Sequence, residues 1–319
     1  MSLRWVGSLL ATHLLLGFFL FGCQELNFDG IESKRRTSSK FIIEDAPLAP
    51  WPKELDKLRL GVTPFTSEDE IKEAYAPLLD HLASRLGVKA ELVLVDSYSD
   101  LGERMRRQEI DIGTFPPLSY VHARHADPGL RLLLRQVADG SDTYIGYVYT
   151  LDDVPVQSIL DLAGRSICYV DPHSASGYLY PRLLIKRLGH DPDQFFSRSI
   201  FAHTHMACME RVLNGDVDAS ATYSGTFSIA RSNGLPMHRI KILAKTPPIP
   251  FDAYCVRSGL PEQAVRRIKQ ELLGLSTRTP DGLRVLSHKM KLNAWITAED
   301  SDYDSVREAL AALNRNPKL

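Results

Sequence analysis

The sequence contains few cysteines and shows no pattern that joins them. Its 319 residues include 4 cysteines, at positions 23, 168, 208 and 255. None of them belongs to a Cys-x-x-Cys pair or to a set with metal-ligand spacing, so neither a disulfide framework nor a zinc site is implied. We expect Cys168, Cys208 and Cys255 to be buried as small hydrophobic residues. The sequence also gives no signature of a cofactor.

The chain also has almost no excess charge of either sign. It carries 38 Lys and Arg against 39 Asp and Glu, a formal net charge of −1. Without a basic field it could not hold a polyanion by releasing counterions, so nucleic acid is not expected as a partner. Hydrophobic residues make up 44% and charged residues 24%, which excludes collagen-like, wholly disordered and polytopic membrane proteins. At about 150 residues per domain, the length predicts about two domains.

One long apolar run is present, at the N-terminus. It extends from Trp5 to Leu20, directly after Arg4. A membrane-spanning helix needs about 20 apolar residues, so this shorter run is typical of a signal peptide. The run ends in Leu20-Phe21-Gly22-Cys23, which resembles a bacterial lipobox, although bulky Phe21 departs from that pattern. We predict a lipoprotein signal peptide over 1–22, with Cys23 as the lipidated N-terminus. The alternative is an uncleaved N-terminal anchor.

Residues 23–56 follow as a polar, aperiodic segment. They include the basic run Lys34-Arg35-Arg36 and the prolines Pro47, Pro50 and Pro52. Such a segment buries too little apolar surface to offset the entropy lost on ordering. We therefore predict a tether that holds an exported protein at the membrane, on the periplasmic or extracellular face of the cell envelope.

From residue 57 onward, β-rich runs alternate with amphipathic helical patterns, which is typical of an α/β fold. The predicted strands are 58–63, 90–95, 110–115, 130–137, 144–150, 166–170, 199–202, 217–223, 240–244 and 253–256, with helices over 176–188, 206–214 and 261–273. The helical stripe from Tyr75 to Leu86 should be capped by Gly87. Because proline belongs in a first helical turn, Pro77 predicts that this helix begins near Ala76.

The order of these elements predicts two lobes, with the second inserted into the first. Lobe 1 is expected to comprise 57–149 plus 246–319, and lobe 2 to comprise 150–245.

The sharpest local feature is the run from Asp171 to Tyr178, between a predicted strand and a predicted helix. It reads Asp-Pro-His-Ser-Ala-Ser-Gly-Tyr. The N-terminus of a helix offers unpaired N–H donors and a positive dipole end, so anions bind there. Gly177 would allow a ligand to approach the backbone. The alternative is that a serine only caps the helix.

This run resembles the Asp-Pro-Asn-Ser-Thr-Ser-Gly motif of the phosphate/phosphite/phosphonate-binding family of ABC-transporter solute-binding proteins. Further motifs of that family occur in the same order between about residues 58 and 275: Tyr75-Ala76-Pro77-Leu78, Val95-Asp96-Ser97-Tyr98, Asp111-Ile112-Gly113, Ala202-His203-Thr204-His205, Gly215-Asp216-Val217-Asp218 and Ile249-Pro250-Phe251-Asp252.

The resemblance implies a type II periplasmic binding protein, with two α/β lobes joined by two crossover strands and the ligand cleft between them. Together with the predicted lipidation at Cys23, it implies a lipid-anchored, monomeric component of an ABC importer that closes around phosphate, phosphite or an alkylphosphonate. The partner would be the permease of the transporter. Two alternatives stay open: a sensory module that signals to a separate membrane partner, and a binder of another small ligand on the same scaffold.

Matching the motifs residue by residue places seven residues in the implied ligand site: Tyr75 and Phe115 from one lobe, Ser174, Ala175, Ser176 and His205 from the other, and Asp252 at the return crossing. Three positions depart from the family. Phe115 replaces a frequent tyrosine and Ala175 a threonine. Gly225 stands where binders of aminoalkylphosphonates carry an acid, which argues against an amino-substituted ligand.

Each site residue also has a structural alternative. Tyr75 and Phe115 could pack in the core, His205 could cap its helix while His203 binds the ligand, and Asp252 could serve only as a turn residue. An ionised carboxylate only accepts hydrogen bonds. Asp252 would therefore favour a ligand with a P–OH group over sulfate.

The remaining functional class to consider is an enzyme. Serine, histidine and aspartate are the components of a hydrolytic triad. However, the sequence lacks a Gly-x-Ser-x-Gly elbow, a His-Glu-x-x-His motif and a phosphate-binding P-loop. We therefore expect a binding protein without catalytic residues.

Overall fold

The computed structural model describes residues 50–63, 65–286 and 290–314. The predicted signal peptide, the lipidation site Cys23 and residues 23–49 of the predicted tether lie outside the described residues. At the end of that segment, Trp51 and Leu55 pack against the core of the first sheet. The indole Nε1 of Trp51 donates a hydrogen bond of 2.6 Å to the carbonyl of Leu55.

The first sheet has six strands in the order β13-β4-β12-β3-β1-β2. Its strands β1 to β4 run parallel, and β12 and β13 run antiparallel to them. The bounds are β1 Lys57–Val62, β2 Lys89–Leu94, β3 Ile112–Phe115, β4 Arg131–Val137, β12 Ala253–Val256 and β13 Ala294–Thr297. Its helices are α1 Glu68–Leu86, α2 Tyr98–Arg106, α3 Pro117–Ala126, α7 Glu262–Leu273 and α8 Pro280–Val285. The last helix, α9 Asp304–Asn314, packs both on α3 and on the helix Tyr180–Arg187 of the second sheet.

The second sheet has five strands in the order β10-β6-β9-β7-β8, formed by the chain between β4 and β12. Here β7, β8 and β9 are parallel, and β6 is antiparallel to β9 and β10. The bounds are β6 Gly146–Leu151, β7 Ser166–Tyr169, β8 Arg198–Phe201, β9 Ala219–Tyr223 and β10 Ile240–Lys245. Its helices are α4 Tyr180–Arg187, α5 His205–Leu213 and α6 Ser224–Ser232. Short turns of helix cover Ile159–Leu162, Ala175–Leu179 and Met237–Arg239.

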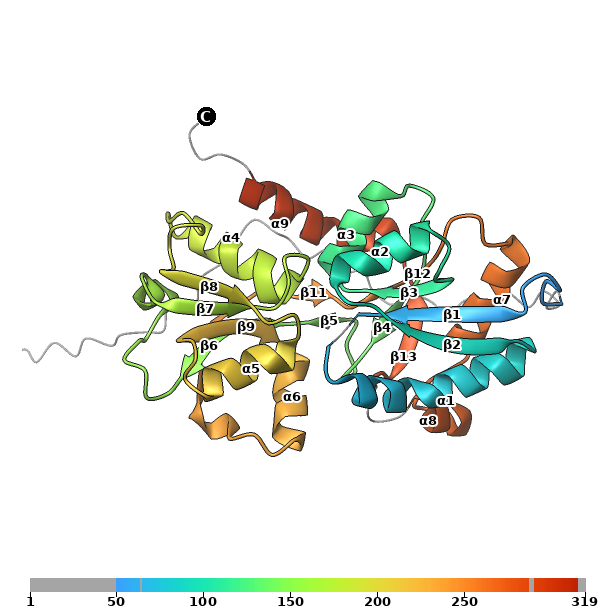
Figure 1. Cartoon of the computed structure of the whole chain (residues 1–319), viewed down its shortest axis with the longest axis horizontal. Helices are drawn as coiled ribbons and strands as arrows, with labels where there is room; N and C mark the ends of the chain where they lie inside the picture. Colours follow the sequence, from blue (N-terminus) through green and yellow to red (C-terminus); the bar gives the residue numbers. More distant parts are fainter. Residues whose placement is uncertain (1–49, 64, 287–289, 315–319) are drawn as a thin grey trace, which may run out of the picture. The chain divides into compact units, whose positions relative to one another are not determined.

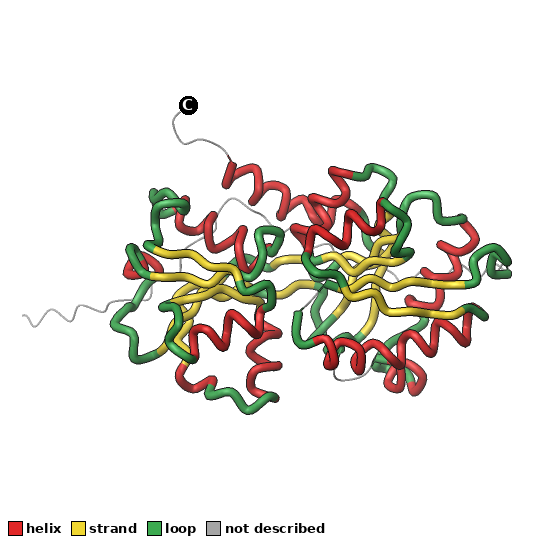
Figure 2. The backbone as a smooth tube through the Cα atoms, viewed as in Figure 1, coloured by secondary structure: helices red, strands yellow, loops and turns green. Residues whose placement is uncertain are grey.

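Two segments connect the sheets, and they pair with each other. Strand β5 (Thr143–Tyr144) leads into the second sheet, and β11 (Ile249–Pro250) leads back, antiparallel to β5. Figure 1 shows β5 and β11 side by side between the two sets of strands. The strands of each sheet are covered by helices on both faces (Figure 2). The chain therefore has two α/β lobes joined by two crossover strands.

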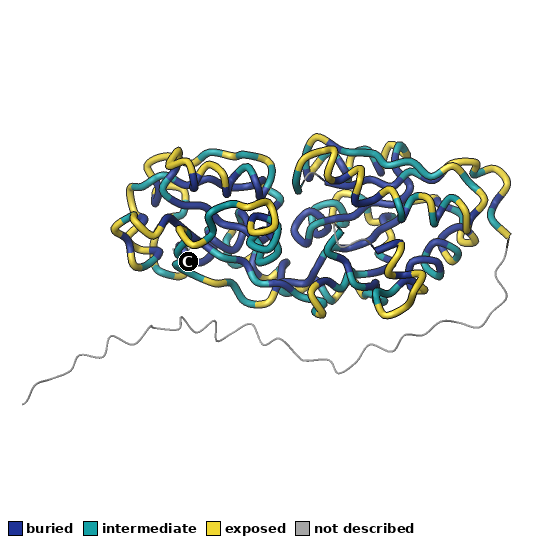
Figure 3. The backbone as a smooth tube through the Cα atoms, turned by 90° about the horizontal axis from the view of Figure 1, so that it is seen from below, coloured by how far each residue is buried: buried dark blue, intermediate teal, exposed yellow. Residues whose placement is uncertain are grey.

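Burial follows from the position of each strand in its sheet. The central strands β3 and β12 are buried at every residue, whereas β1 alternates before becoming fully buried. Strands covered on both faces are apolar along their whole length. In Figure 3 the buried segments lie inside each lobe and the exposed ones on its outer turns. Cys168, Cys208 and Cys255 are all fully buried, as predicted.

Helix α1 begins eight residues before the predicted start at Ala76. Its first turn is fixed by a capping box in which the Ser67 side chain accepts from the Glu70 backbone and the Glu70 side chain accepts from Ser67. Pro77 lies inside the helix, where it removes only one backbone hydrogen bond. The buried stripe runs through it from Ile71 to Leu86, and this packing outweighs the local defect. The predicted cap at Gly87 is confirmed, with a left-handed φ of 71°.

Candidate functional site

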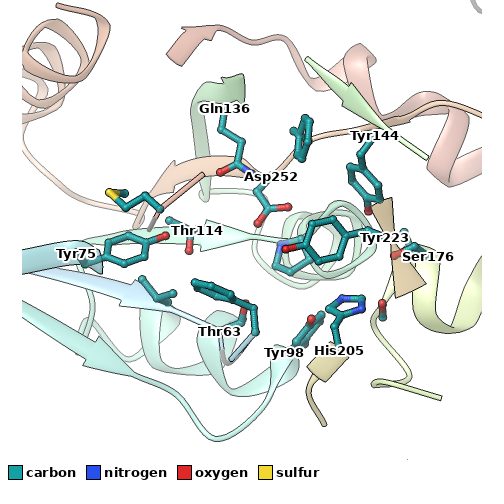
Figure 4. Close-up of a pocket in the computed structure, with 17 residues that line it drawn as sticks. Thr63, Tyr75, Tyr98, Thr114, Gln136, Tyr144, Ser176, His205, Tyr223 and Asp252 are labelled. Atoms are coloured by element: carbon teal, nitrogen blue, oxygen red, sulfur yellow. The ribbon is translucent and has the colours of Figure 1, made fainter. Parts of the chain in front are cut away.

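A small cavity of about 90 Å³ lies between the two lobes. Most of its walls are the carboxyl ends of parallel strands and the loops or helix starts that follow them, where ligands bind in open α/β sheets. Figure 4 shows the side chains converging on it. The lining residues are Val62, Thr63, Phe65, Tyr75, Tyr98, Thr114, Pro116, Gln136, Tyr144, Ser174, Ala175, Ser176, His205, Tyr223, Phe251, Asp252 and Met290.

The structure brings six of the seven predicted residues to this cavity. They are Tyr75, Ser174, Ala175, Ser176, His205 and Asp252. The seventh, Phe115, is completely buried in the core beneath α2 and does not line the cavity. Successive side chains of a strand point to opposite faces. Its neighbour Thr114 therefore faces the cavity, while the Phe115 ring faces the helix. Position 115 thus follows the alternative interpretation, in which Phe115 packs in the core.

The loop between β7 and α4 supplies three of the predicted residues. Ser174 caps the turn that follows, because its hydroxyl accepts a 3.0 Å hydrogen bond from the Gly177 N–H. Ser174, Ala175 and Ser176 are nonetheless all on the cavity wall. The first N–H groups of a helical segment have no partner within that segment. The loop thus caps its helix and presents polar groups to the cavity at the same time.

Gly177 has a different role from the one predicted. A Cβ atom at this position would lie 2.6 Å from Cγ2 of Val170 and 2.9 Å from Oγ of Ser174. Gly177 is also absent from the cavity wall. The missing side chain therefore lets the turn pack tightly on the end of β7, rather than letting a ligand approach the backbone.

His205 is the first residue of α5, and Thr204, not His205, caps that helix. Its Nδ1 atom lies 2.7 Å from the hydroxyl of Thr222, which lies 2.6 Å from the hydroxyl of Thr226. Burial lowers the pKa of His205 to about 3, so the imidazole is neutral at physiological pH. His203 is exposed and adopts a φ of 64°, outside the cavity.

Asp252 follows β11 on the returning crossover, and its carboxylate points into the cavity (Figure 4). Burial raises its pKa from 3.8 to about 7. A carboxyl group with this pKa is present in both its protonated and its ionised form near neutral pH. Among the lining residues that the structure describes, none is a lysine or an arginine. The described wall of the cavity therefore offers neutral hydrogen-bond donors around one ionisable acid.

Four tyrosines surround that acid: Tyr75, Tyr98, Tyr144 and Tyr223. Burial raises the pKa of Tyr98, Tyr144 and Tyr223, and the nearby charge of Asp252 raises these pKa values further. Burial also raises the pKa of Tyr75, to about 12. All four phenols are consequently protonated at neutral pH and can donate hydrogen bonds. The Tyr223 ring also packs edge-on against His205, with centroids 4.9 Å apart.

Sequence reasoning missed several lining residues, and most of them had a usable signal. Thr63, Thr114, Gln136 and Tyr223 stand at or directly after the carboxyl ends of predicted strands. Tyr98 ends one of the quoted motifs. Tyr144, in contrast, lies on the outgoing crossover, and no local pattern marks it. Gly225 is not on the cavity wall, and a Cβ there would collide with the Tyr223 ring, so this position could not carry an acid in the present arrangement.

Two other features, a metal site and a membrane-spanning helix, are absent from the described residues. Within residues 50–63, 65–286 and 290–314, no three or more His, Cys, Asp or Glu side chains are grouped so that they could hold a metal ion. In the same described ranges, no helix has both the length and the apolar character needed to cross a membrane.

Comparison with known proteins shows a family match over most of the chain. Residues 60–303 match a family model described as the periplasmic substrate-binding protein of the phosphonate ABC transporter. The phosphate-import protein PhnD of Mycolicibacterium smegmatis is 26% identical over 274 residues, which is 79% of this chain and 84% of that protein.

Two solved structures have the same fold. One is a binding protein component of a phosphonate ABC transporter from Pseudomonas aeruginosa, with a TM-score of 0.76, 19% identity and coverage of 82% of this chain and 90% of that chain. The other is PhnD1 from Prochlorococcus marinus in complex with methylphosphonate, with a TM-score of 0.74, 19% identity and coverage of 82% and 99%.

Proposed function

Because the chain belongs to the family of periplasmic substrate-binding proteins of phosphonate ABC transporters, we propose that it binds a small phosphorus oxyanion between its lobes and delivers it to a permease. Both the motif-based resemblance and the type II periplasmic binding protein fold are confirmed. The members of this family are transport proteins rather than enzymes, in agreement with the sequence-based expectation.

The main observation that supports this proposal is the composition of the cavity wall. In the described part of the wall, neutral hydroxyl groups from both lobes surround a single carboxyl group, and no Lys or Arg lies among these residues. A small oxyanion can be held by many neutral hydrogen bonds in a site that excludes water, where each bond is stronger than in solvent. Phosphate, phosphite and alkylphosphonates are the candidates, because the small cavity suits a ligand of few heavy atoms.

The second lobe is proposed to bind the oxygens of the ligand through Ser174, Ala175, Ser176 and His205. The serines would donate through their hydroxyls, and Ala175 through its backbone N–H. His205 is neutral and has one N–H donor. With Nδ1 accepting from Thr222, that donor is Nε2–H, which would point its proton at the ligand.

Asp252 is proposed to select for a protonated ligand. As a carboxylate it would accept a hydrogen bond from a P–OH group. Fully deprotonated sulfate has no such proton, so its binding would place two negative charges in contact without compensation. Tyr75 would donate to the ligand from the first lobe, which would connect closure of the lobes to ligand binding.

Export and anchoring complete the proposal. The expected division into 57–149 plus 246–319 and 150–245 would cut strand β6, which belongs to the second sheet. We therefore propose that the outgoing boundary lies at β5, a few residues earlier, with β5 and β11 as the hinge. The lipid on Cys23 and the tether would keep the monomeric receptor near its permease at the outer face of the membrane.

The direct test is a binding titration. The protein, stripped of ligand by unfolding and refolding, is titrated by calorimetry with phosphate, phosphite, methylphosphonate, aminoethylphosphonate and sulfate. A ligand at about 100 times its Kd stabilises the folded state by about 2.7 kcal/mol, which raises the melting temperature of a protein this size by about 4 to 5 °C. Saturable binding of one phosphorus oxyanion, without sulfate binding, is expected. No response to any phosphorus compound would refute the ligand class.

A further inference from the structure

Two cysteines from separate elements meet in the core of the second lobe. Cys168 lies in β7 and Cys208 in α5, and both are completely buried. Their sulfur atoms are 2.8 Å apart, although the residues are 40 positions apart in the sequence. Cys255 lies in β12 of the other sheet and belongs to a different core cluster.

The sulfur separation points to a bond rather than to a contact. It is well inside the distance at which two unbonded sulfur atoms ordinarily rest. A disulfide bond is about 2.05 Å long, so less than about 1 Å of movement would join the atoms. Both sulfurs also face the same acceptor, the carbonyl oxygen of Tyr169, at 3.7 Å and 3.3 Å. No metal-binding group is found around them in the described part of the chain.

We propose that Cys168 and Cys208 form a disulfide bond in the exported protein. The proposal rests on export into an oxidising compartment, where such bonds form and persist. The thiolate of one cysteine attacks a donor disulfide to give a mixed disulfide, and the second thiolate then displaces the donor sulfur. The two cysteines lose two electrons and two protons, and the donor disulfide leaves as two thiols.

Because both sulfurs are inaccessible in the folded state, this exchange precedes the closing of the core around them. The bond would join two elements that carry proposed ligand contacts. Strand β7 leads into the loop with Ser174 and Ser176, and Cys208 lies one helical turn after His205. A covalent link at this point holds the loop and the helix start in one arrangement before a ligand arrives.

The first experiment maps the thiols of the full exported chain, purified from the cell envelope without reductant. The protein is denatured in excess iodoacetamide, digested and analysed by mass spectrometry. We expect one linked peptide pair containing Cys168 and Cys208, with a carbamidomethylated Cys255. After reduction, all three positions should be carbamidomethylated. Alkylation of Cys168 and Cys208 without reduction, or linkage of either residue to another cysteine, would overturn the proposal.

A second readout does not depend on variants that fold poorly. The chain is unfolded and refolded with or without dithiothreitol, and the melting temperatures are compared. Closing a loop of this length should raise the melting temperature by about 5 to 10 °C. The variant C255A is the matched control and should keep the full difference. C208A, if it folds, should show no difference, and an equal melting temperature for both wild-type preparations would contradict the bond.

Discussion

The Nδ1 atom of His205 lies 2.7 Å from the hydroxyl oxygen of Thr222. Thr222 and Thr226 are completely buried, and the hydrogen-bonded series from imidazole to Thr226 fixes the ring within the lobe. Since burial lowers the pKa of His205 to about 3, the ring carries no charge near pH 7. His205 therefore supplies a positioned neutral group, whereas the ionisable partner in the cavity is Asp252.

Removing the imidazole should weaken ligand binding. We expect His205→Ala to lower the affinity for the preferred oxyanion about 10-fold, because one buried hydrogen bond contributes about 1 kcal/mol or somewhat more. Thr222→Val should give a smaller loss by releasing the ring. Calorimetry measures both effects. The matched control is His203→Asn, at an exposed position with positive φ. If His203→Asn lost as much affinity as His205→Ala, the ligand contact would have to be assigned to His203 as well.

Asp252→Asn tests the selection between oxyanions. The amide retains the shape of the side chain but removes the negative charge. We expect weaker binding of the phosphorus oxyanion, by about 10-fold or more, since hydrogen bonds to charged groups contribute about 1.5 to 3 kcal/mol. Sulfate should bind better to the variant than to the wild type. A competition titration measures the ratio, and an unchanged ratio would remove Asp252 from discrimination.

The raised pKa of Asp252 also predicts how stability depends on pH. The folded-state pKa is about 7 and the ordinary value is 3.8, so the folded protein binds the proton more tightly than the unfolded chain. The contribution of protonated Asp252 to the free energy of unfolding is present in full below about pH 4, and it is lost as the pH rises to about 7. A shift of this size corresponds to at most about 4 kcal/mol.

Urea unfolding of the ligand-free protein between pH 4 and pH 8 measures this effect. Relative to the wild type, Asp252→Asn should gain stability as the pH rises, because an amide has no such titration. Asp96→Asn, at an exposed position, is the control and should follow the wild type. Parallel curves for wild type and Asp252→Asn would show that burial does not perturb this carboxyl group.

Substitutions at Tyr75 and Phe115 distinguish a residue that contacts the ligand, Tyr75, from a residue that packs in the core, Phe115. Tyr75→Phe removes one hydroxyl at the cavity wall and should lower the affinity by about 5-fold to 10-fold, with little change in stability. Phe115→Leu leaves the cavity wall intact but removes packing from the core beneath α2. It should reduce the free energy of unfolding by about 1 to 2 kcal/mol, with affinity unchanged. Loss of affinity without loss of stability at position 115 would restore it to the ligand site.

The sequence determined most of the strands, the helices with the clearest apolar stripes and the contiguous part of the site, but it did not delimit α2, α3, α6, α8, α9 or β13. Alternating apolar runs fix strands and helices because period and propensity are local properties. The motif from Asp171 to Tyr178 could be interpreted for the same reason, since one loop contains its serines and its helix start. The start of α1 also has a local signal, Ser67 followed by Glu70. The prediction rested on Pro77 instead, and it was wrong because a proline can lie inside a helix whose packing is strong.

Only the tertiary structure decided which distant residues meet. The parallel strands of both sheets end at the same cavity, and this brings Thr63, Thr114 and Tyr223 together with Ser176. Tyr144 joins them only because the two crossovers pair. The choice between Thr114 and Phe115 depended on which face of β3 is turned to the cavity at the end of the strand and which packs against α2. The approach of Cys168 to Cys208 likewise depends on how α5 packs against β7. Sequence periodicity defines the two faces of a strand, but the packing of the whole chain decides what each face meets.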